Sequence, residues 1–496
     1  MNHTHRLIII IALLACGAPA KAQPDPSAQS TAARTAKPGQ ARISVAQPDK
    51  STQIRRLLAD NHLPGIQLVY TRDAHSEVYN LGTTGDPTHP VTSNTIFEAA
   101  SLSKCVFAYI VLRLYDRGRI NLDTSLLAYL GTYPRFDSTD PRYARITARM
   151  VLHHTTGLPN WGDSAHCLLR FTPDSCFSYS GEGYMFLQRV VEKITGKTLE
   201  ELAEQEVFTP LHMTGSSYVW QPRFDSVSAF GHSPDAIKAH SNAGSAFSLL
   251  TNAHDYTLFV QALAAGRGLK PTTHRMMLTP AVNAGWLNRP PTEATPHIHW
   301  GLGVGLQEDA APGPAFWHWG DNGSFKAYYI VYPNTHETLV YFVHDYRGLF
   351  ITQELCDLFF GKQPCWGILW SGEGYESPWS MKTFKTALGQ QNFDNAAAIY
   401  DRLKQQGDTL SEHDLNEYGF LLLSGKRSKD AVAIFKLNLG LHPQSANAFD
   451  SLAEGYEASG EKALALENFK QSLQRNPKND YAAEHIKKLQ TSLQAQ

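Results

Sequence analysis

The sequence predicts an α+β domain that is followed by an all-α region. Runs typical of β-strands stand near both ends of residues 51–365, and helical patterns lie between them, which is the usual order in an α+β domain. From about residue 381 the pattern is helical and repeats at a period of 34 residues. The chain has 496 residues, more than one ordinary domain contains, so two or three domains are expected.

Residues 1–22 have the pattern of an export signal. A short apolar run at residues 7–14 is followed by small residues that offer an A-x-A cleavage site. The stretch "LLAC" also resembles the lipobox of bacterial lipoproteins, in which Cys16 would be lipidated. Both alternatives predict an exported protein, which is either periplasmic or a membrane-anchored lipoprotein.

Composition narrows the class of protein and its partners. Residues 23–50 are rich in Ala, Gln, Pro and Ser, and they predict a disordered tether. The whole chain is 42% hydrophobic and 18% charged, which suits a globular protein with a sizeable core. Its formal net charge is −2 and it has no basic run, so nucleic acid is not an expected partner.

The elements of the first domain follow from local patterns. A helix is expected at 51–60, and a strand follows at 65–71. A helix buried in the core is expected at 101–117 and a later helix at 184–195, and they end at Gly118 and Gly196. Four strand-like runs come late, and the last two flank "PNTHE" as an antiparallel hairpin. These runs are 299–306, 315–320, 326–332 and 338–345.

The C-terminal region, residues 381–496, contains an internal repeat. Ala431, Phe435 and Pro443 recur 34 residues later as Ala465, Phe469 and Pro477. This spacing resembles the tetratricopeptide repeat, a helix–turn–helix unit that stacks on its neighbours. Residues 383–410 resemble a degenerate third copy, and residues 366–380 are expected to be a linker. The repeats either bind a protein partner in a groove or pack as a helical appendage.

The cysteines predict disulfides, because exported chains form them. Cys16 belongs to the leader, and Cys105 lies in an apolar run and is expected to be a buried thiol. The other four form two local pairs, Cys167 with Cys176 and Cys356 with Cys365, each nine residues apart. The alternative is four unrelated thiols. The spacings do not fit a zinc site, and no metal or cofactor is expected.

The residues Ser101 and Lys104 begin an otherwise apolar helix. Residues three apart share a helix face, so the two side chains are neighbours in the first turn. A helix N-terminus disfavours an ammonium group, and burial lowers a lysine pKa. A partly neutral Lys104 could therefore remove the proton of Ser101, which needs a base to be a nucleophile. The structural alternative is an N-cap serine, and Ser459 with Lys462 shows that the S-x-x-K pattern also occurs elsewhere in the chain.

Two further motifs give the pair a context. "FSYSGEGY" carries Tyr179 on a loop before a helix, and "FWHWGDNGSF" carries His318 and Gly320 at a strand end. The order Ser-x-x-Lys, then Tyr, then [Lys/His]-x-Gly resembles the serine β-lactamase and penicillin-binding protein family. The similar branch contains class C β-lactamases, D-Ala-D-Ala carboxypeptidases and esterases. "LHHTTGLPNW" and "NAGSAFSLLTNAHDYTLF" agree with it, so the resemblance covers about residues 52–345.

The resemblance implies a fold and roles for these residues. The fold would be β-lactamase/transpeptidase-like, with an antiparallel sheet flanked by helices and a helical subdomain. Ser101 would be acylated, and Lys104 and Tyr179 would share the proton transfers, with positive charge from Lys104 or a protonated His318 lowering the phenol pKa. The oxyanion would sit between the backbone N–H groups of Ser101 and Asp321, where Gly320 lets the strand approach the substrate.

Two departures from the family pattern bear on the substrate. Members that act on β-lactams usually have Tyr-x-Asn, whose amide holds the substrate acylamide, whereas the third position here is Gly181. They often have Lys-Thr-Gly, where this chain has His318. An ordinary His pKa of about 6.5 would make His318 cationic only below neutral pH. Trp161, Trp317 and Trp319 either line an apolar pocket or belong to the core.

These observations predict an exported serine hydrolase that works through an acyl-enzyme on Ser101. The expected substrate is a small ester or a (D-amino) peptide or amide, and peptidoglycan is one source of such a peptide. One alternative is a β-lactamase or D-Ala-D-Ala carboxypeptidase. Another is a non-catalytic protein that binds peptidoglycan and recruits a partner through its repeats. Acylation of Ser101 by a reactive probe distinguishes the enzyme from the binding protein.

Overall fold

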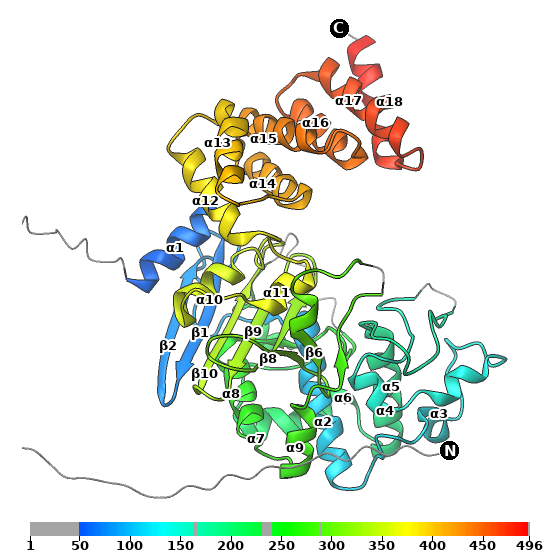
Figure 1. The fold of residues 1–496 in the computed structure, drawn as a ribbon. Helices are drawn as coiled ribbons and strands as arrows, with labels where there is room; N and C mark the ends of the chain where they lie inside the picture. Colours follow the sequence, from blue (N-terminus) through cyan, green and yellow to red (C-terminus); the bar gives the residue numbers. More distant parts are fainter. Residues whose placement is uncertain (1–48, 163–165, 231–240, 288, 495–496) are drawn as a thin grey trace, which may run out of the picture. The chain divides into compact units, whose positions relative to one another are not determined.

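The computed structural model describes residues 49–162, 166–230, 241–287 and 289–494 (Figure 1). The predicted export signal, with Cys16, and residues 23–48 of the predicted tether lie outside the described residues. Within the described ranges, every helix is too short or too polar to cross a bilayer.

The centre of the first domain is an antiparallel sheet of eight strands in the order β2-β1-β10-β9-β8-β7-β6-β5. The first strands of the domain pair with the last one, since Ile66 in β1 lies opposite Val343 in β10. The expected hairpin around "PNTHE" is present as β9 and β10, with Tyr332 opposite Glu337. The strands are β1 (Gly65–Arg72), β2 (His75–Gly82), β5 (Val282–Asn283), β6 (Ile298–Trp300), β7 (Gly305–Gln307), β8 (Ala315–Asp321), β9 (Lys326–Tyr332) and β10 (Glu337–Val343).

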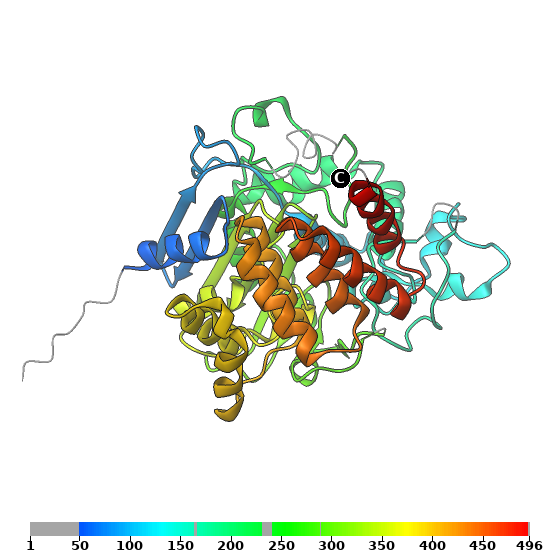
Figure 2. The ribbon, with the colours of Figure 1, turned by 90° about the horizontal axis from the view of Figure 1, so that it is seen from above.

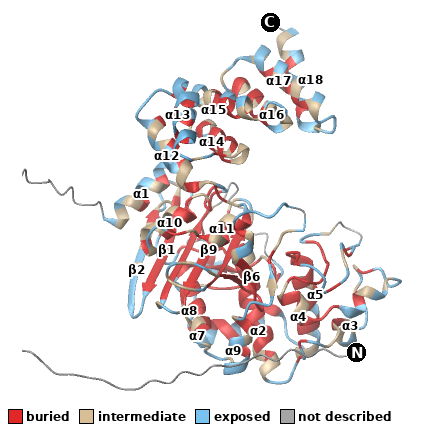
Figure 3. Cartoon of the chain, in the orientation of Figure 1, coloured by how far each residue is buried: buried red, intermediate tan, exposed pale blue. Residues whose placement is uncertain are grey.

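Helices cover both faces of this sheet, so the central strands are buried throughout their length (Figure 3). Tyr329 and Val331 of β9 pack in the core that contains α2 and α8, whereas Tyr328 and Ile330 pack in the core that contains α1, α10 and α11. This alternation explains why "KAYYIVY" has no polar face. The helices are α1 (Lys50–Asp60), α2 (Ser103–Asp116), α8 (Ala253–Ala264), α10 (Thr352–Phe360) and α11 (Trp366–Ser371).

A helical subdomain is inserted between β2 and β5. Its longest helix is α5 (Gly181–Thr195), which ends at Gly196 in a left-handed conformation, as the sequence predicts. A two-stranded ladder of β3 (Phe97–Glu98) and β4 (Leu250–Thr251) joins the segments before Ser101 and before α8. The shorter helices of the subdomain are α3 (Leu126–Leu130), α4 (Ala148–Leu152), α6 (Leu199–Ala203), α7 (Thr209–Leu211) and α9 (Pro271–Met277). These elements match the α+β architecture that the resemblance implies.

The predicted linker differs from the observed structure. α11 lies within residues 366–380, and Ile368 and Trp370 are buried in the core on one face of the sheet. The reason is the apolar composition of "WGILW", which gains free energy by covering that face. The polar part of the linker is therefore shorter than expected and ends where α12 begins at Pro378.

The C-terminal region consists of helical hairpins at the predicted period. The first helices of three hairpins begin at residues 378, 412 and 446, and one further helix begins at residue 480, each 34 residues after the one before. The degenerate third copy is therefore a full helix pair, α12 with α13. Figure 2 shows these helices in succession from above. They are α12 (Pro378–Gly389), α13 (Ala396–Gln405), α14 (Glu412–Ser424), α15 (Ser428–Leu441), α16 (Ala446–Ala458), α17 (Lys462–Arg475) and α18 (Asp480–Gln494).

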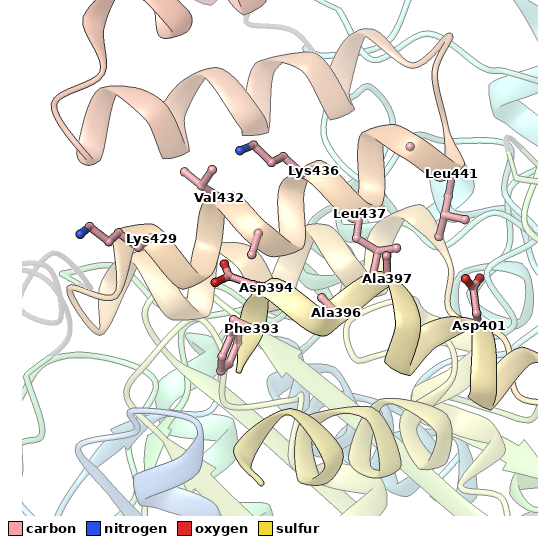
Figure 4. A pocket seen from close by; sticks show the side chains of 12 residues that line it. Phe393, Asp394, Ala396, Ala397, Asp401, Lys429, Val432, Lys436, Leu437 and Leu441 are labelled. Carbon is pink, nitrogen blue, oxygen red and sulfur yellow. The ribbon is translucent and has the colours of Figure 1, made fainter. Parts of the chain in front are cut away.

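The repeated residues form the contacts between these helices. Phe435 is fully buried, and its ring would lie 2.2 Å from a Cβ at Gly419 and 2.9 Å from one at Gly455. Glycine at both positions therefore lets α14 and α16 approach α15 closely. A hollow of about 520 Å³ opens between α13 and α15 (Figure 4). It carries charges of both signs, including Asp394 and Lys436. That a protein partner binds in this hollow stays a prediction.

No two of the described cysteines form a disulfide, so the two predicted bridges are not formed in this structure. Cys356 and Cys365 are buried with their sulfur atoms 3.2 Å apart, which is hydrogen-bond contact and longer than the ~2.05 Å of a disulfide. Cys167 is buried, whereas Cys176 is exposed. Cys105 is a buried thiol, as expected.

Candidate active site

Ser101 lies in a short 3-10 helix, η1 (Ala100–Leu102), directly before α2. The expected helix from residue 101 therefore begins as a tighter turn, and the α-helix proper starts at Ser103. Ala100 has φ 48, a left-handed conformation that costs free energy for a residue with a Cβ. This strained turn carries the serine out of the buried helix, since Ser101 is half-buried whereas the residues after it are buried.

Lys104 is positioned against Ser101 in the first turn of α2. Its Nζ lies 3.1 Å from Ser101 Oγ and donates to the carbonyl oxygen of Ala246 at 2.7 Å. The side chain is only 1% exposed, and burial lowers its pKa from 10.5 to about 7. A substantial fraction of Lys104 is therefore neutral at pH 7 and able to accept the serine proton.

The structure brings Tyr179 to the same place. Lys104 Nζ lies 4.8 Å from the centre of the Tyr179 ring and 5.8 Å from that of Tyr184. Burial raises the pKa of Tyr179 well above 10.0, and the smaller lowering effect of the nearby Ser101 does not offset this. Tyr179 is therefore a phenol at neutral pH, which can relay a proton but is not the initial base.

His318 does not have the charge that the sequence suggested. Its ring is fully buried, and its Nδ1–H donates to the carbonyl oxygen of Trp319 at 2.7 Å. Burial, with Lys104 nearby, lowers its pKa from 6.5 to about 3. His318 is therefore neutral above pH 4, and the expectation that it supplies positive charge to Tyr179 or to a substrate carboxylate is wrong. The physical reason is that aromatic rings surround His318 in place of the water that would solvate a charged imidazolium.

Several buried polar atoms around Lys104 lack a hydrogen-bond partner within the described part of the chain. They share one cluster, because the His154 ring lies 4.4 Å from that of Tyr179 and 5.3 Å from that of Tyr184. Buried polar atoms are nearly always paired in native proteins, so a cluster of unpaired ones marks a place where water or substrate binds. The atoms are His154 Nε2, Tyr179 Oη, Tyr184 Oη and His318 Nε2.

Strand β8 brings Gly320 and Asp321 to the edge of this cluster. A Cβ at Gly320 would lie 2.4 Å from the carbonyl oxygen of Ala99, so only glycine lets β8 pass this close to the serine turn. Asp321, the next residue and the last of β8, is thereby placed beside η1, where its backbone N–H and that of Ser101 could face one oxyanion.

Charged residues at this edge were missed by the sequence reasoning. The Lys326 ammonium lies 2.7 Å from Asp321 Oδ2 and 3.6 Å from Glu373 Oε2. Burial raises the pKa of the Glu373 carboxyl, which also lies close enough to Tyr179 to act on its pKa. Glu373 lies in residues 371–375, whose sequence "SGEGY" also occurs in "FSYSGEGY", and this sequence alone carries no sign of the position of Glu373. The ammonium at this edge is already paired with carboxylates.

The tryptophans divide between core and surface. Trp317 is fully buried in the sheet core, and Trp319 packs on Tyr179 with ring centres 4.9 Å apart. Trp161 is instead 50% exposed. Its indole carbons occupy the space where a side chain at Gly181 would begin, 2.8 Å from an ideal Cβ. Of these three tryptophans, Trp161 is the one that offers a large exposed surface to a substrate.

The second S-x-x-K pattern provides an internal comparison. Ser459 donates to the carbonyl oxygen of Tyr456, and Lys462 Nζ donates to Ser492 Oγ at 2.7 Å. That lysine is partly exposed and has its hydrogen bond to another serine. The lysine-to-serine contact and the deep burial therefore belong to the first pattern. Within the described ranges, the structure places no three His, Cys, Asp or Glu side chains as a metal site.

Comparisons with known proteins agree with this geometry. Penicillin-binding protein 4 of Amycolatopsis lactamdurans is 31% identical over 173 residues, which are 31% of this chain and 45% of that protein. Esterase EstB of Burkholderia gladioli is 30% identical over 161 residues, 26% of this chain and 40% of the esterase. The octameric penicillin-binding protein homologue from Pyrococcus abyssi has a TM-score of 0.55 at 17% identity, covering 67% of this chain and 80% of that one.

The chain spans less than half the length of these two curated relatives, and the structural likeness concerns the fold. The family model for β-lactamases matches residues 51–350, which contain Ser101, Lys104, Tyr179 and the strand end at Gly320. The chain therefore belongs to the β-lactamase family, which is of the serine hydrolase type.

Proposed function

We propose that this chain is an exported serine hydrolase that forms an acyl-enzyme on Ser101, with a neutral ester or a (D-amino) peptide or amide as its substrate. The observation that carries this proposal is the contact between Ser101 Oγ and the buried Lys104 Nζ, 3.1 Å apart, with the pKa of Lys104 lowered to about 7. A base with a pKa near the working pH is the most effective general base.

The residues support the following steps. Neutral Lys104 takes the proton of Ser101 as Oγ bonds to the substrate carbonyl carbon, and the oxyanion accepts hydrogen bonds from the N–H groups of Ser101 and Asp321. The carbon–oxygen or carbon–nitrogen bond of the leaving group then breaks, and the leaving group receives the proton from Lys104 through the Tyr179 hydroxyl. A water molecule repeats the sequence on the acyl-enzyme, which releases the acid and restores Ser101.

The charges at the site favour substrates without a carboxylate beside the reacting carbonyl. His318 is neutral, and the Lys326 ammonium beside Asp321 already has Asp321 and Glu373 as partners. A substrate carboxylate at this edge would therefore have to compete with Asp321 and Glu373 for Lys326. For the same reason, turnover of penicillins and of peptides ending in D-Ala should be slow relative to that of activated esters.

Labelling with a fluorophosphonate, followed by peptide mapping, tests the proposal. The wild-type protein should be labelled at Ser101, and Ser101→Ala should lose the label. Ser459→Ala is the matched control, because Ser459 stands in the same S-x-x-K pattern without the lysine contact, and this variant should be labelled like the wild type. Absence of label from fluorophosphonate and from labelled penicillin would favour a non-catalytic binding protein.

Export, and lipidation of Cys16 as its alternative form, remain part of the proposal because they rest on residues outside the described ranges. Mass spectrometry of the N-terminus of protein isolated from cells separates cleavage near residue 22 from a lipidated Cys16. An intact residue 1–22 segment on the mature protein would contradict both. A protein partner of the helical repeats is likewise proposed on their period and on the hollow between α13 and α15.

A further inference from the structure

The space beside Gly181 is filled by an aromatic ring. An ideal Cβ at Gly181 would lie 2.8 and 2.9 Å from two carbons of the Trp161 indole, and 3.0 Å from the carbonyl oxygen of Asn160. A side chain at this position would therefore require the indole to move. In β-lactam-directed relatives this position usually carries an amide side chain, whereas here the Trp161 indole occupies that space.

The backbone on both sides of Trp161 is held in place. The carbonyl oxygen of Asn160 accepts the N–H groups of Gly181 and Glu182, both at 3.1 Å. On the other side, the N–H of Gly162 donates to Glu182 Oε1 at 3.0 Å. A 50% exposed indole on a segment tied to α5 at two points is an ordered apolar surface rather than a loose side chain.

A second ring completes this surface. Phe247 follows Ala246, whose carbonyl oxygen accepts the hydrogen bond of Lys104. The Phe247 ring also lies over a glycine, because a Cβ at Gly244 would be 2.7 Å from it. The rings of Trp161 and Phe247 meet edge to face, with centres 5.7 Å apart and planes at 79°. The two rings therefore connect the Gly181 side of the site with the Lys104 side.

Amide side chains near this pair are already engaged. Asn322 Nδ2 donates to Glu98 Oε2 at 2.6 Å and to the carbonyl oxygen of Phe247 at 3.2 Å. Asn160 Oδ1 accepts the N–H of Gly181 at 3.0 Å. A substrate acylamide that bonded to Asn322 Nδ2 or Asn160 Oδ1 would have to displace these bonds, whereas an apolar acyl chain gains contact with the rings without displacing them.

We propose that Trp161 and Phe247 form a clamp for the acyl group of the substrate, which selects acyl chains that end in an aromatic or branched apolar group. This proposal rests on the proposed hydrolase function, because the clamp would act on the acyl group attached to Ser101. The substrates are then esters or amides of apolar acids, for example arylacetyl esters.

The test compares p-nitrophenyl phenylacetate with p-nitrophenyl acetate. For each ester, kcat/KM is divided by the rate constant for hydroxide, which removes the difference in intrinsic reactivity. The wild-type protein should favour the phenylacetyl ester by about tenfold or more, the usual effect of burying part of a phenyl group. Trp161→Ala and Phe247→Ala should each reduce this ratio several-fold, and Trp161→Phe should retain part of it.

The control is Tyr481→Ala in α18, which removes another exposed aromatic side chain (46% exposed) far along the chain and should leave the ratio unchanged. A wild-type ratio near one, or an unchanged ratio in Trp161→Ala, would overturn the clamp while leaving the hydrolase intact.

Failure of the proposed function has a different signature, namely that no probe acylates Ser101. The clamp is then judged by binding alone, with Ser101→Ala and saturation-transfer NMR of phenylacetamide against acetamide. Selective binding of phenylacetamide that disappears when Trp161→Ala is added would support the apolar site. Equal binding of the two amides, or binding that survives Trp161→Ala, would overturn it.

Discussion

The pH dependence of ester hydrolysis should report the protonation of Lys104. Its pKa is lowered from 10.5 to about 7 by burial, which corresponds to about 5 kcal/mol against the ammonium form at about 1.4 kcal/mol for each pKa unit. A general base works when it is deprotonated, so the rate should rise with pH. We expect kcat/KM for p-nitrophenyl acetate to be about tenfold lower at pH 6 than on its plateau above pH 8.

Other groups of the cluster do not titrate in this range. His318 has a pKa of about 3, the pKa of His154 lies well below 6.5, and that of Tyr179 lies well above 10.0. These three groups should therefore add no ionisation to the profile between pH 5 and pH 9. Following the released nitrophenol at its isosbestic wavelength keeps the assay itself independent of pH.

Lys104→Arg provides the decisive comparison, because a guanidinium stays protonated at every accessible pH. The variant should lose about 10²- to 10⁴-fold in kcat/KM, the usual contribution of a general base, and its residual rate should lose the ionisation near pH 7. Lys462→Arg, in the second S-x-x-K pattern, should behave as the wild type. A wild-type profile that is flat from pH 5 to pH 9, or a Lys104→Arg profile that keeps the same ionisation, would refute the assignment of Lys104 as the base.

Three other predictions concern the acyl side of the site, the cysteines and the repeats. Gly181→Asn alone should lower the rate at which Ser101 is acylated by penicillin, because the new Cβ would lie 2.8 Å from the Trp161 indole. Adding Trp161→Ala should raise this rate above that of the single variant, and no gain in the double variant would contradict the steric reason. Diamide should couple Cys356 to Cys365, whose sulfurs are 3.2 Å apart, and non-reducing peptide maps with both thiols free after oxidation would refute this. Phe435→Ala should destabilise the repeats by about 3–5 kcal/mol in urea unfolding while fluorophosphonate labelling persists, and an unchanged unfolding midpoint would show that this buried ring is not a core residue.

Features that depend on local pattern could be predicted from the sequence alone. The alternation and turn residues around "PNTHE" predict the β9–β10 hairpin, and Gly196 predicts the end of α5, because each depends on neighbours along the chain. The 34-residue period predicts where the helix pairs recur, since every copy must present the same buried residues to the next one. The motifs also predicted that the side chains of Ser101, Lys104 and Tyr179 lie together in one site.

The electrostatics and the substrate side of the site depend on contacts between distant parts of the chain. The neutrality of His318 follows from the rings that bury it, and those come from separate segments of the chain. The position of Glu373 beside Lys326 depends on where α11 packs, which no motif records. The Trp161 indole likewise fills the space beside Gly181 because of the fold, and no motif in the sequence records this contact. Desolvation and steric exclusion depend on which distant residues surround a group, and a linear sequence does not specify those distances.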